Sequence, residues 1–183
     1  MRRFVIPSTL ALLATVSIAL GHDPRTVAKE FTHTMMVEGS GKLSMTYKSL
    51  HWNEPVYVSF KANDQLRTRV LNAVWKKIGK LDTDFEVVIG GTKIGKGSYD
   101  LGITFDAKDN FSLILGAAGK DTVIPLKTAS DGPMVDFLAF DIRPADPQKP
   151  DTFVIEGRGG KFRSSVELTV PALAPHEHGE TKK

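Results

Sequence analysis

A chain of 183 residues is long enough for one domain with a hydrophobic core, and its content of 41% hydrophobic and 25% charged residues is ordinary for a globular protein. The absence of cysteine excludes disulfide bonds, thiolate metal sites and cysteine nucleophiles. The net charge of +3 would indicate a polyanion partner only if the basic residues belonged to the folded part of the chain.

Residues 1–21 have the pattern of a secretory signal peptide. Two arginines precede an apolar run from Phe4 to Leu20, and small residues follow. The run spans about seventeen residues, whereas a transmembrane helix needs about twenty. We therefore expect cleavage before His22 and no transmembrane span after signal cleavage, with an uncleaved anchor as the alternative.

Export changes the meaning of the net charge. Removal of the signal peptide lowers the 24 basic residues to 22, against 21 acidic residues, so the predicted mature chain has a net charge of only +1. This balance argues against a nucleic-acid partner. A cysteine-free exported chain suits a bacterial periplasm or a secreted protein, and its predicted partner is an unknown ligand of the envelope or the extracellular space.

The predicted elements begin with a poorly patterned N-terminal segment, residues 22–42, which fits either a weak helical stripe or part of a strand. Residues 43–52 are predicted as a strand and residues 53–55 as a turn. Apolar side chains then recur at every second position (Val56, Val58 and Phe60), which predicts a half-buried strand over residues 56–60.

One segment predicts a helix, at about residues 63–78. Asn63 or Asp64 can cap its N-terminus, and its apolar side chains cover about half of the helical circumference. Gly79 is predicted to end it. Seven further strands are predicted after this helix, at residues 84–89, 98–105, 111–116, 122–126, 134–142, 152–157 and 164–170.

About nine short strands separated by turn signals predict an all-β, mainly antiparallel, β-sandwich-like fold with one inserted helix near residues 63–78. The predicted domain comprises residues 43–170. Residues 144–151 are rich in proline and are predicted as a loop. The polar residues 171–183 are predicted to be a disordered tail.

The segment GGTKIGKGS at residues 90–98 nearly matches the sequence motif of a phosphate-binding loop. Gly97, however, stands where that loop needs a hydroxyl for magnesium, and an alternating strand follows where a helix is required. We therefore predict a hairpin turn here and no nucleotide site.

Histidine offers one metal-site hypothesis. If cleavage falls before His22, its imidazole and the free α-amine could chelate copper as a histidine brace, with His33 or His51 as the further ligand. Otherwise no cofactor is predicted.

Motifs for hydrolysis are few. The chain has no Gly-x-Ser-x-Gly elbow and no His-Glu-x-x-His pair. Carboxylate pairs of glycosidases obey no spacing rule, so four aspartates near strands leave a hydrolase open as an alternative: Asp82, Asp84, Asp136 and Asp141.

The segment WKKIGKLDT at residues 75–83 resembles the Trp-Arg-Thr-Gly-Ala-Asn-Glu-Ala-Thr segment of domain of unknown function 2911, a family of exported bacterial proteins. Residues 45–49 resemble the family's Tyr-Ser-Arg-Pro strand, and Phe111 replaces the tryptophan of a later strand. The resemblance covers roughly residues 43–170. Within this range, Gly97, Tyr99 and Leu101 are in register with a further stretch of the family's pattern.

This resemblance implies an exported, mostly β domain without an established activity. Four residues follow from it as ligand-binding candidates: Tyr47, Trp75, Lys76 and Thr83. A site here requires Tyr47, Lys76, Lys77 and Thr83 to converge on one concave surface. Lys76 stands where the family has arginine. We therefore predict an exported binding or structural module of unknown ligand. The alternative is a periplasmic or secreted hydrolase, or a copper protein using His22.

Overall fold

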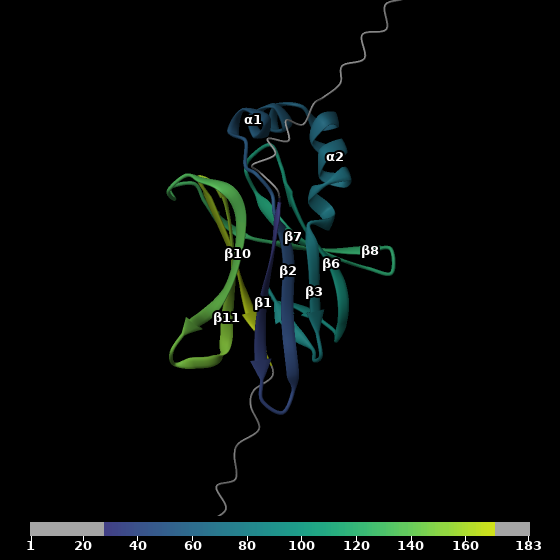
Figure 1. Cartoon of the computed structure of the whole chain (residues 1–183), viewed down its shortest axis with the longest axis vertical. Coiled ribbons are helices and arrows are strands. Elements are labelled where there is room, and N and C mark those ends of the chain that lie inside the picture. The colour runs from purple at the N-terminus through teal and green to yellow at the C-terminus, as the bar shows by residue number, and fades with distance from the viewer. Residues whose placement is uncertain (1–27, 171–183) are drawn as a thin grey trace, which may run out of the picture.

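The computed structural model describes residues 28–170, which form two antiparallel sheets packed face to face. The predicted signal peptide, His22 and the predicted tail 171–183 lie outside the described residues. Figure 1 shows the two sheets side by side, with two short helices at one end of the molecule. The predicted all-β, sandwich-like fold class is confirmed.

Within residues 28–170, the first sheet has six strands. Its strands are ordered β1-β2-β3-β6-β7-β8, and neighbouring strands are antiparallel. Their bounds are β1 (Lys29–Val37), β2 (Gly41–Ser49), β3 (Gly79–Thr83), β6 (Gly97–Phe105), β7 (Phe111–Ala117) and β8 (Lys120–Pro125).

The second sheet has the order β10-β11-β12-β4-β5, and β9 pairs separately with β12. Its long strands form consecutive hairpins, whereas β4 and β5 flank the predicted glycine turn at Gly90 and Gly91. The bounds are β4 (Val87–Ile89), β5 (Thr92–Ile94), β9 (Lys127–Ala129), β10 (Val135–Asp146), β11 (Lys149–Gly160) and β12 (Phe162–Thr169).

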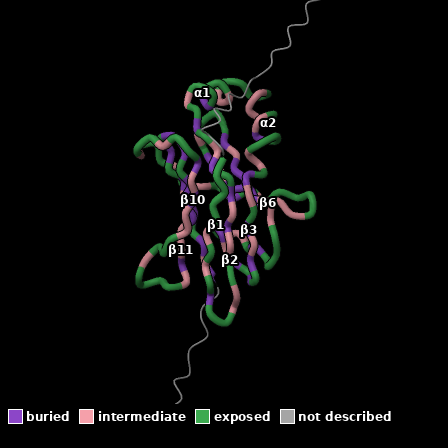
Figure 2. The backbone as a smooth tube through the Cα atoms, viewed as in Figure 1, coloured by how far each residue is buried: buried purple, intermediate pink, exposed green. Residues whose placement is uncertain are grey.

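Alternating apolar residues from both sheets meet in the core. Successive side chains of a strand point to opposite faces, so every second residue faces the other sheet. Figure 2 shows buried positions concentrated between the sheets and exposed ones at the loops and helices. Fully buried members include Leu43, Met45, Leu101, Leu113, Leu115, Ile124 and Leu168.

Residues 56–60 are helical, so the predicted strand there is wrong. They belong to α1 (Glu54–Ala62), where Asn53 Oδ1 accepts a hydrogen bond from the Val56 amide at 3.0 Å. This cap and Pro55 in the first turn favour a helix, and they override the alternating pattern. Tyr57 is the buried residue of this helix, and Val58 is exposed.

The predicted helix at 63–78 is shorter than expected. Asn63 caps α2 (Asp64–Ala73), as predicted, and a single 3-10 turn, η1 (Trp75–Lys77), follows. Gly79 begins β3 instead of only ending a helix. A Cβ at Gly79 would collide with the Thr46 carbonyl, so this position needs glycine to let β3 pair closely with β2.

Residues 144–151 form the ends of β10 and β11, so the predicted proline-rich loop is also wrong for most of its length. Pro144 is tolerated because β10 lies at an edge of its sheet, where one side of the strand needs no hydrogen-bond donor. Residues 29–37 of the N-terminal segment pair with β2 in continuous register as β1.

The two sheets are joined directly next to β2. The Leu138 amide donates to the Leu50 carbonyl at 2.8 Å, and the Trp52 amide donates to the Asp136 carbonyl at 2.7 Å. These bonds bring one end of β10 onto the chain that leaves β2. Within residues 28–170, no helix is both long and apolar enough to cross a membrane.

Candidate functional site

Two of the predicted ligand-binding residues lie in the core. Tyr47 is 3% exposed, and its hydroxyl donates to the Phe140 carbonyl of the second sheet at 3.1 Å. Thr83 is 4% exposed, and its hydroxyl donates to the Phe85 carbonyl at 2.7 Å. Both groups are satisfied inside the protein, so neither is placed to contact a ligand.

Trp75 also has a packing role. Its half-buried ring lies edge-on to Trp52 and Phe105, with centroid distances of 5.9 and 5.8 Å, and closes one end of the core. Of the four candidates, Lys76 lines a surface groove, whereas Trp75 lines only a cavity of about 10 Å³ in the core. The structure therefore brings Lys76 and Lys77 together in one groove but places Tyr47 and Thr83 elsewhere.

The groove beside Lys76 has a volume of about 290 Å³ and lies between the end of the helical segment and the β7–β8 hairpin. Figure 1 shows this hairpin projecting sideways below α2. Residues 116–119 form part of its lining, and the polar and charged residues in the lining are Asn72, Lys76, Lys77, Asp100, Lys120 and Asp121.

Close backbone packing positions the lysines of η1. A Cβ at Gly102 of β6 would collide with the backbone of Lys76, so η1 rests directly on the sheet. The Ile78 amide then donates to the Leu101 carbonyl at 2.9 Å and holds the end of the turn on the same strand. Lys76 and Lys77 consequently extend from a rigid support towards the hairpin.

Two aspartates of the sheet face these lysines. Asp100, Gly116 and Asp121 are directly opposite one another on β6, β7 and β8. Lys76 Nζ lies 3.2 Å from Asp121 Oδ2, and Lys77 Nζ lies 2.9 Å from Asp100 Oδ2. The hydrogen bond and the negative charge of Asp100 raise the pKa of Lys77.

Lys120 makes the groove net positive. It is exposed, and among the described residues no ion pair engages it, so three lysines face two aspartates. The ammonium groups can bind an anion, while the carboxylates and the Asn72 amide can bind hydroxyl groups. Each carboxylate is paired with one ammonium group and keeps lone pairs that can accept a further hydrogen bond. The arrangement therefore offers both donors and acceptors to a ligand.

His33 and His51 do not share a site. His33 pairs with Met45 across β1 and β2, whereas His51 lies six residues beyond Met45 along the chain. At about 3.3 Å per residue of extended strand, about 20 Å separates these positions, too far for one metal ion. Residues 28–170 contain no group of three histidine, aspartate or glutamate side chains that could hold a metal.

Each histidine has its own neighbours. His33 Nδ1 lies 3.8 Å from Asp141 Oδ1, and its ring stacks on Tyr47 with a centroid distance of 5.9 Å. His51 is exposed and packs edge-on against Phe137. A copper brace could therefore use at most one of these two histidines together with His22, which lies outside the described residues.

The four aspartates named for hydrolysis are divided between the sheets. Asp82 lies in β3 and Asp84 directly after it, whereas Asp136 and Asp141 lie in β10. Asp84 Oδ2 accepts the Lys42 amide at 3.0 Å. The aspartates that do face one groove are Asp100 and Asp121, which the sequence pattern did not single out because they become neighbours only through the β6–β7–β8 register.

A partly buried polar network around Tyr57 was also missed from the sequence. The Tyr57 hydroxyl donates to Asp109 Oδ1 and Lys61 Nζ donates to Asp109 Oδ2, both at 2.6 Å. Burial, together with the hydrogen bond to Asp109, raises the pKa of Tyr57 well above its ordinary value. The network fastens α1 to the turn between β6 and β7, and it has a structural explanation without a ligand.

Three comparisons with known proteins identified no relative of this chain. The chain matches no model of a known protein family, and no curated protein or solved structure is significantly similar to it. The resemblance to domain of unknown function 2911 therefore stays a prediction.

Proposed function

We propose that this chain is an exported binding module that holds a hydroxyl-rich ligand with an anionic group, such as an acidic sugar, in the groove between η1 and the β7–β8 hairpin. The observation that carries this proposal is the groove itself, where three lysines and two aspartates line about 290 Å³. Lysine ammonium groups suit the anion, and aspartate carboxylates accept hydrogen bonds from hydroxyl groups.

The support beneath the groove favours recognition of a defined ligand. Lys76 and Lys77 extend from a turn packed on Gly102, and the aspartates come from paired strands. Binding groups on rigid elements lose less conformational freedom when a ligand arrives. The apolar leader at residues 1–21 motivates the periplasm or the extracellular space as the place where the module acts.

The groove can be tested by NMR titration of the mature protein with galacturonate, glucose 6-phosphate and neutral glucose. We expect the two acids to perturb the amide signals of residues 116–121, and glucose to perturb them much less. The double variant K76Q/K77Q should weaken binding by about tenfold, because each charged hydrogen bond contributes about 1.5–3 kcal/mol before competition with Asp100 and Asp121 is counted.

The matched control is K93Q/K96Q, which removes the same charge from exposed lysines outside the groove lining. It should bind both acids as the wild type does. The proposal is wrong if neither acid perturbs residues 116–121, or if the two double variants lose affinity equally.

A further inference from the structure

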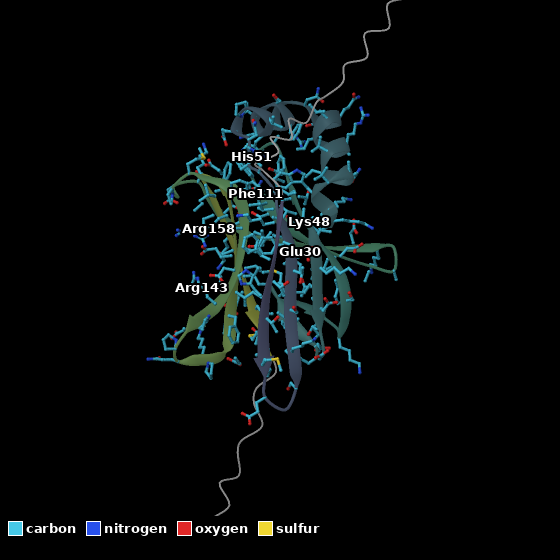
Figure 3. All side chains as sticks on the ribbon, viewed as in Figure 1. Glu30, Lys48, His51, Phe111, Arg143 and Arg158 are labelled. Atoms are coloured by element: carbon cyan, nitrogen blue, oxygen red, sulfur yellow. The ribbon has the colours of Figure 1, made fainter. Side chains whose placement is uncertain are left out.

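Three arginines surround one glutamate on the outer face of the second sheet. Arg143 of β10, Arg158 of β11 and Arg163 of β12 each approach the Glu156 carboxylate, and we call these four residues the arginine cluster. In Figure 3 the labelled Arg143 and Arg158 lie on the side of β10 and β11 that faces away from the first sheet. The cluster is therefore separate from the groove, which lies on the other sheet.

The strand register concentrates positive charge at this point. Arg158 and Arg163 are directly opposite each other on neighbouring strands, an arrangement of like charges that normally destabilises a sheet. Glu156 lies two residues before Arg158 on the same face and offsets this repulsion. Its side chain is only 11% exposed, because the arginines cover it.

One carboxylate cannot satisfy three guanidinium groups. Arg143 Nη2 donates to Glu156 Oε2 at 3.3 Å, whereas the Nε atoms of Arg158 and Arg163 lie 3.6 Å from Oε1. Each guanidinium carries five N–H donors in a planar fork. The arginine side chains are 44–51% exposed, so many of these donors face solvent at positions held by Glu156.

The surroundings of the cluster keep the positive surplus. Asp141 is opposite Glu156 on β10, Glu167 of β12 is opposite Val154, and Lys127 of β9 is opposite Ser165 on the far side of β12. The face thus carries four cations against three carboxylates. The cavity that Arg158 helps to line has only about 10 Å³ and lies among core residues such as Trp52 and Phe162. The exposed guanidinium groups therefore suit an extended molecule rather than a small enclosed one.

We propose that the arginine cluster binds an acidic polysaccharide through its carboxylate or sulfate groups. Arginine forks match these planar or tetrahedral oxyanions and bind them bidentately. Neighbouring strands are about 4.8 Å apart, so the cluster presents cations in successive rows to a polymer lying across the strands. The apolar residues closest in register on this face are small or partly covered (Ala129, Ala139 and Val154), which disfavours insertion into a membrane.

This proposal does not depend on the groove, and its experiment keeps the two apart. Full mature protein is titrated with polygalacturonate, dextran sulfate and neutral dextran at two salt concentrations. We expect the acidic polymers to bind with an affinity that falls as salt rises, and neutral dextran not to bind. Binding to phosphatidylglycerol vesicles in the absence of polysaccharide binding would overturn the proposal.

The decisive variant is R143Q/R158Q/R163Q, which should weaken polymer binding by about tenfold or more. Its control, K29Q/K93Q/K96Q, removes the same charge from exposed positions outside the cluster and should stay within about twofold of the wild type. Equal losses in the two triple variants would show unspecific charge attraction and overturn the proposal. The K76Q/K77Q groove variant should keep most of the affinity for both acidic polymers, because it leaves the arginine cluster intact.

Two further variants separate ligand binding from a purely structural role, including the case in which the triple variant does not fold. R158K keeps the charge but removes the fork, so it should fold normally and bind the acidic polymers about threefold more weakly. E156Q removes the negative charge that holds the arginines, so it should lower the melting temperature and bind the polymers at least as tightly as the wild type. Unchanged binding in R158K together with lost binding in folded E156Q would contradict the proposal.

Discussion

The two sides of η1 make different kinds of interaction, close packing on one side and exposed ion pairs on the other. Its lower side rests on Gly102 with no room for a Cβ, and the ring of its first residue, Trp75, packs on Trp52 and Phe105. Its upper side presents Lys76 and Lys77 to two aspartates through exposed ion pairs. Close packing is intolerant of added atoms, whereas exposed ion pairs contribute about 0–1 kcal/mol.

The difference shows where stability and recognition are separated. The packed side sets the position of the turn, and the charged side can change its partners without affecting the fold. A ligand that replaces Asp121 at Lys76 therefore needs to break only a weak interaction. The following substitutions test this separation, beginning with the largest expected loss of stability.

Gly102→Ala should be the most damaging change. Its Cβ would collide with the backbone of Lys76, so either η1 or β6 must move. We expect the free energy of unfolding to fall by about 3 kcal/mol, at the upper end of the usual effect of overpacking. Urea unfolding followed by tryptophan fluorescence measures this loss. Gly95→Ala is the control, because its nearest neighbour would be 3.8 Å away, and equal stability of the two variants would refute the packing argument.

Tyr57→Phe should have the next largest effect. It removes the hydroxyl that donates to Asp109 and leaves this partly buried carboxylate with Lys61 as its remaining side-chain donor. The expected loss is about 2 kcal/mol, measured by chemical unfolding. Tyr99→Phe, which breaks an exposed hydrogen bond to the Gly95 carbonyl, should cost less, and the reverse order would contradict this interpretation.

Acid should weaken the attachment of α1. Burial acts to raise the pKa of Asp109, but hydrogen bonds from Lys61 and Tyr57 and the charge of Lys61 outweigh it, so the pKa is lowered. The Asn110 side chain and amide likewise lower the pKa of Asp106.

A pKa lowered by folding adds stability that is complete above the unfolded value, about 3.9 for aspartate, and is lost as the pH falls through the folded value. We therefore expect the melting temperature to fall below about pH 4 and Asp109→Asn to flatten this dependence. An unchanged slope in the variant would exclude Asp109 as a contributor.

Lys76→Gln should have the smallest effect on stability. The exposed Lys76–Asp121 pair contributes less than about 1 kcal/mol, so the melting temperature should hardly change, while binding of galacturonate weakens. A large loss of stability would show that the charged side of η1 is structural. In that case the contrast between the two sides would fail.

Several strands followed closely from local patterns, whereas β3 and β9 were not predicted as strands. Residues 98–105 alternate strictly, and β6 spans Gly97–Phe105 with Leu101, Ile103 and Phe105 buried as expected. Prediction failed at residues 56–60, where the alternating valines indicated a strand. Asn53 and Pro55 gave a competing helical start signal, which determined the structure.

The candidate site was predictable only in part. Lys76 was named and does line the groove, but Tyr47 and Thr83 are inward-facing residues of paired strands. The residues that accompany Lys76, namely Asp100, Lys120 and Asp121, are brought there by strand register. No local pattern in the sequence reports that register.

The sequence by itself determined the antiparallel β-sandwich-like class, the strand periods and the capping residue of α2, because these depend on side chains within a few residues of one another. Only the tertiary structure decided which charges meet. The groove joins η1 to β6, β7 and β8, and the arginine cluster joins three strands around Glu156. Both depend on contacts between residues far apart in the chain, which form only when the sheets pair in one register and pack on one core.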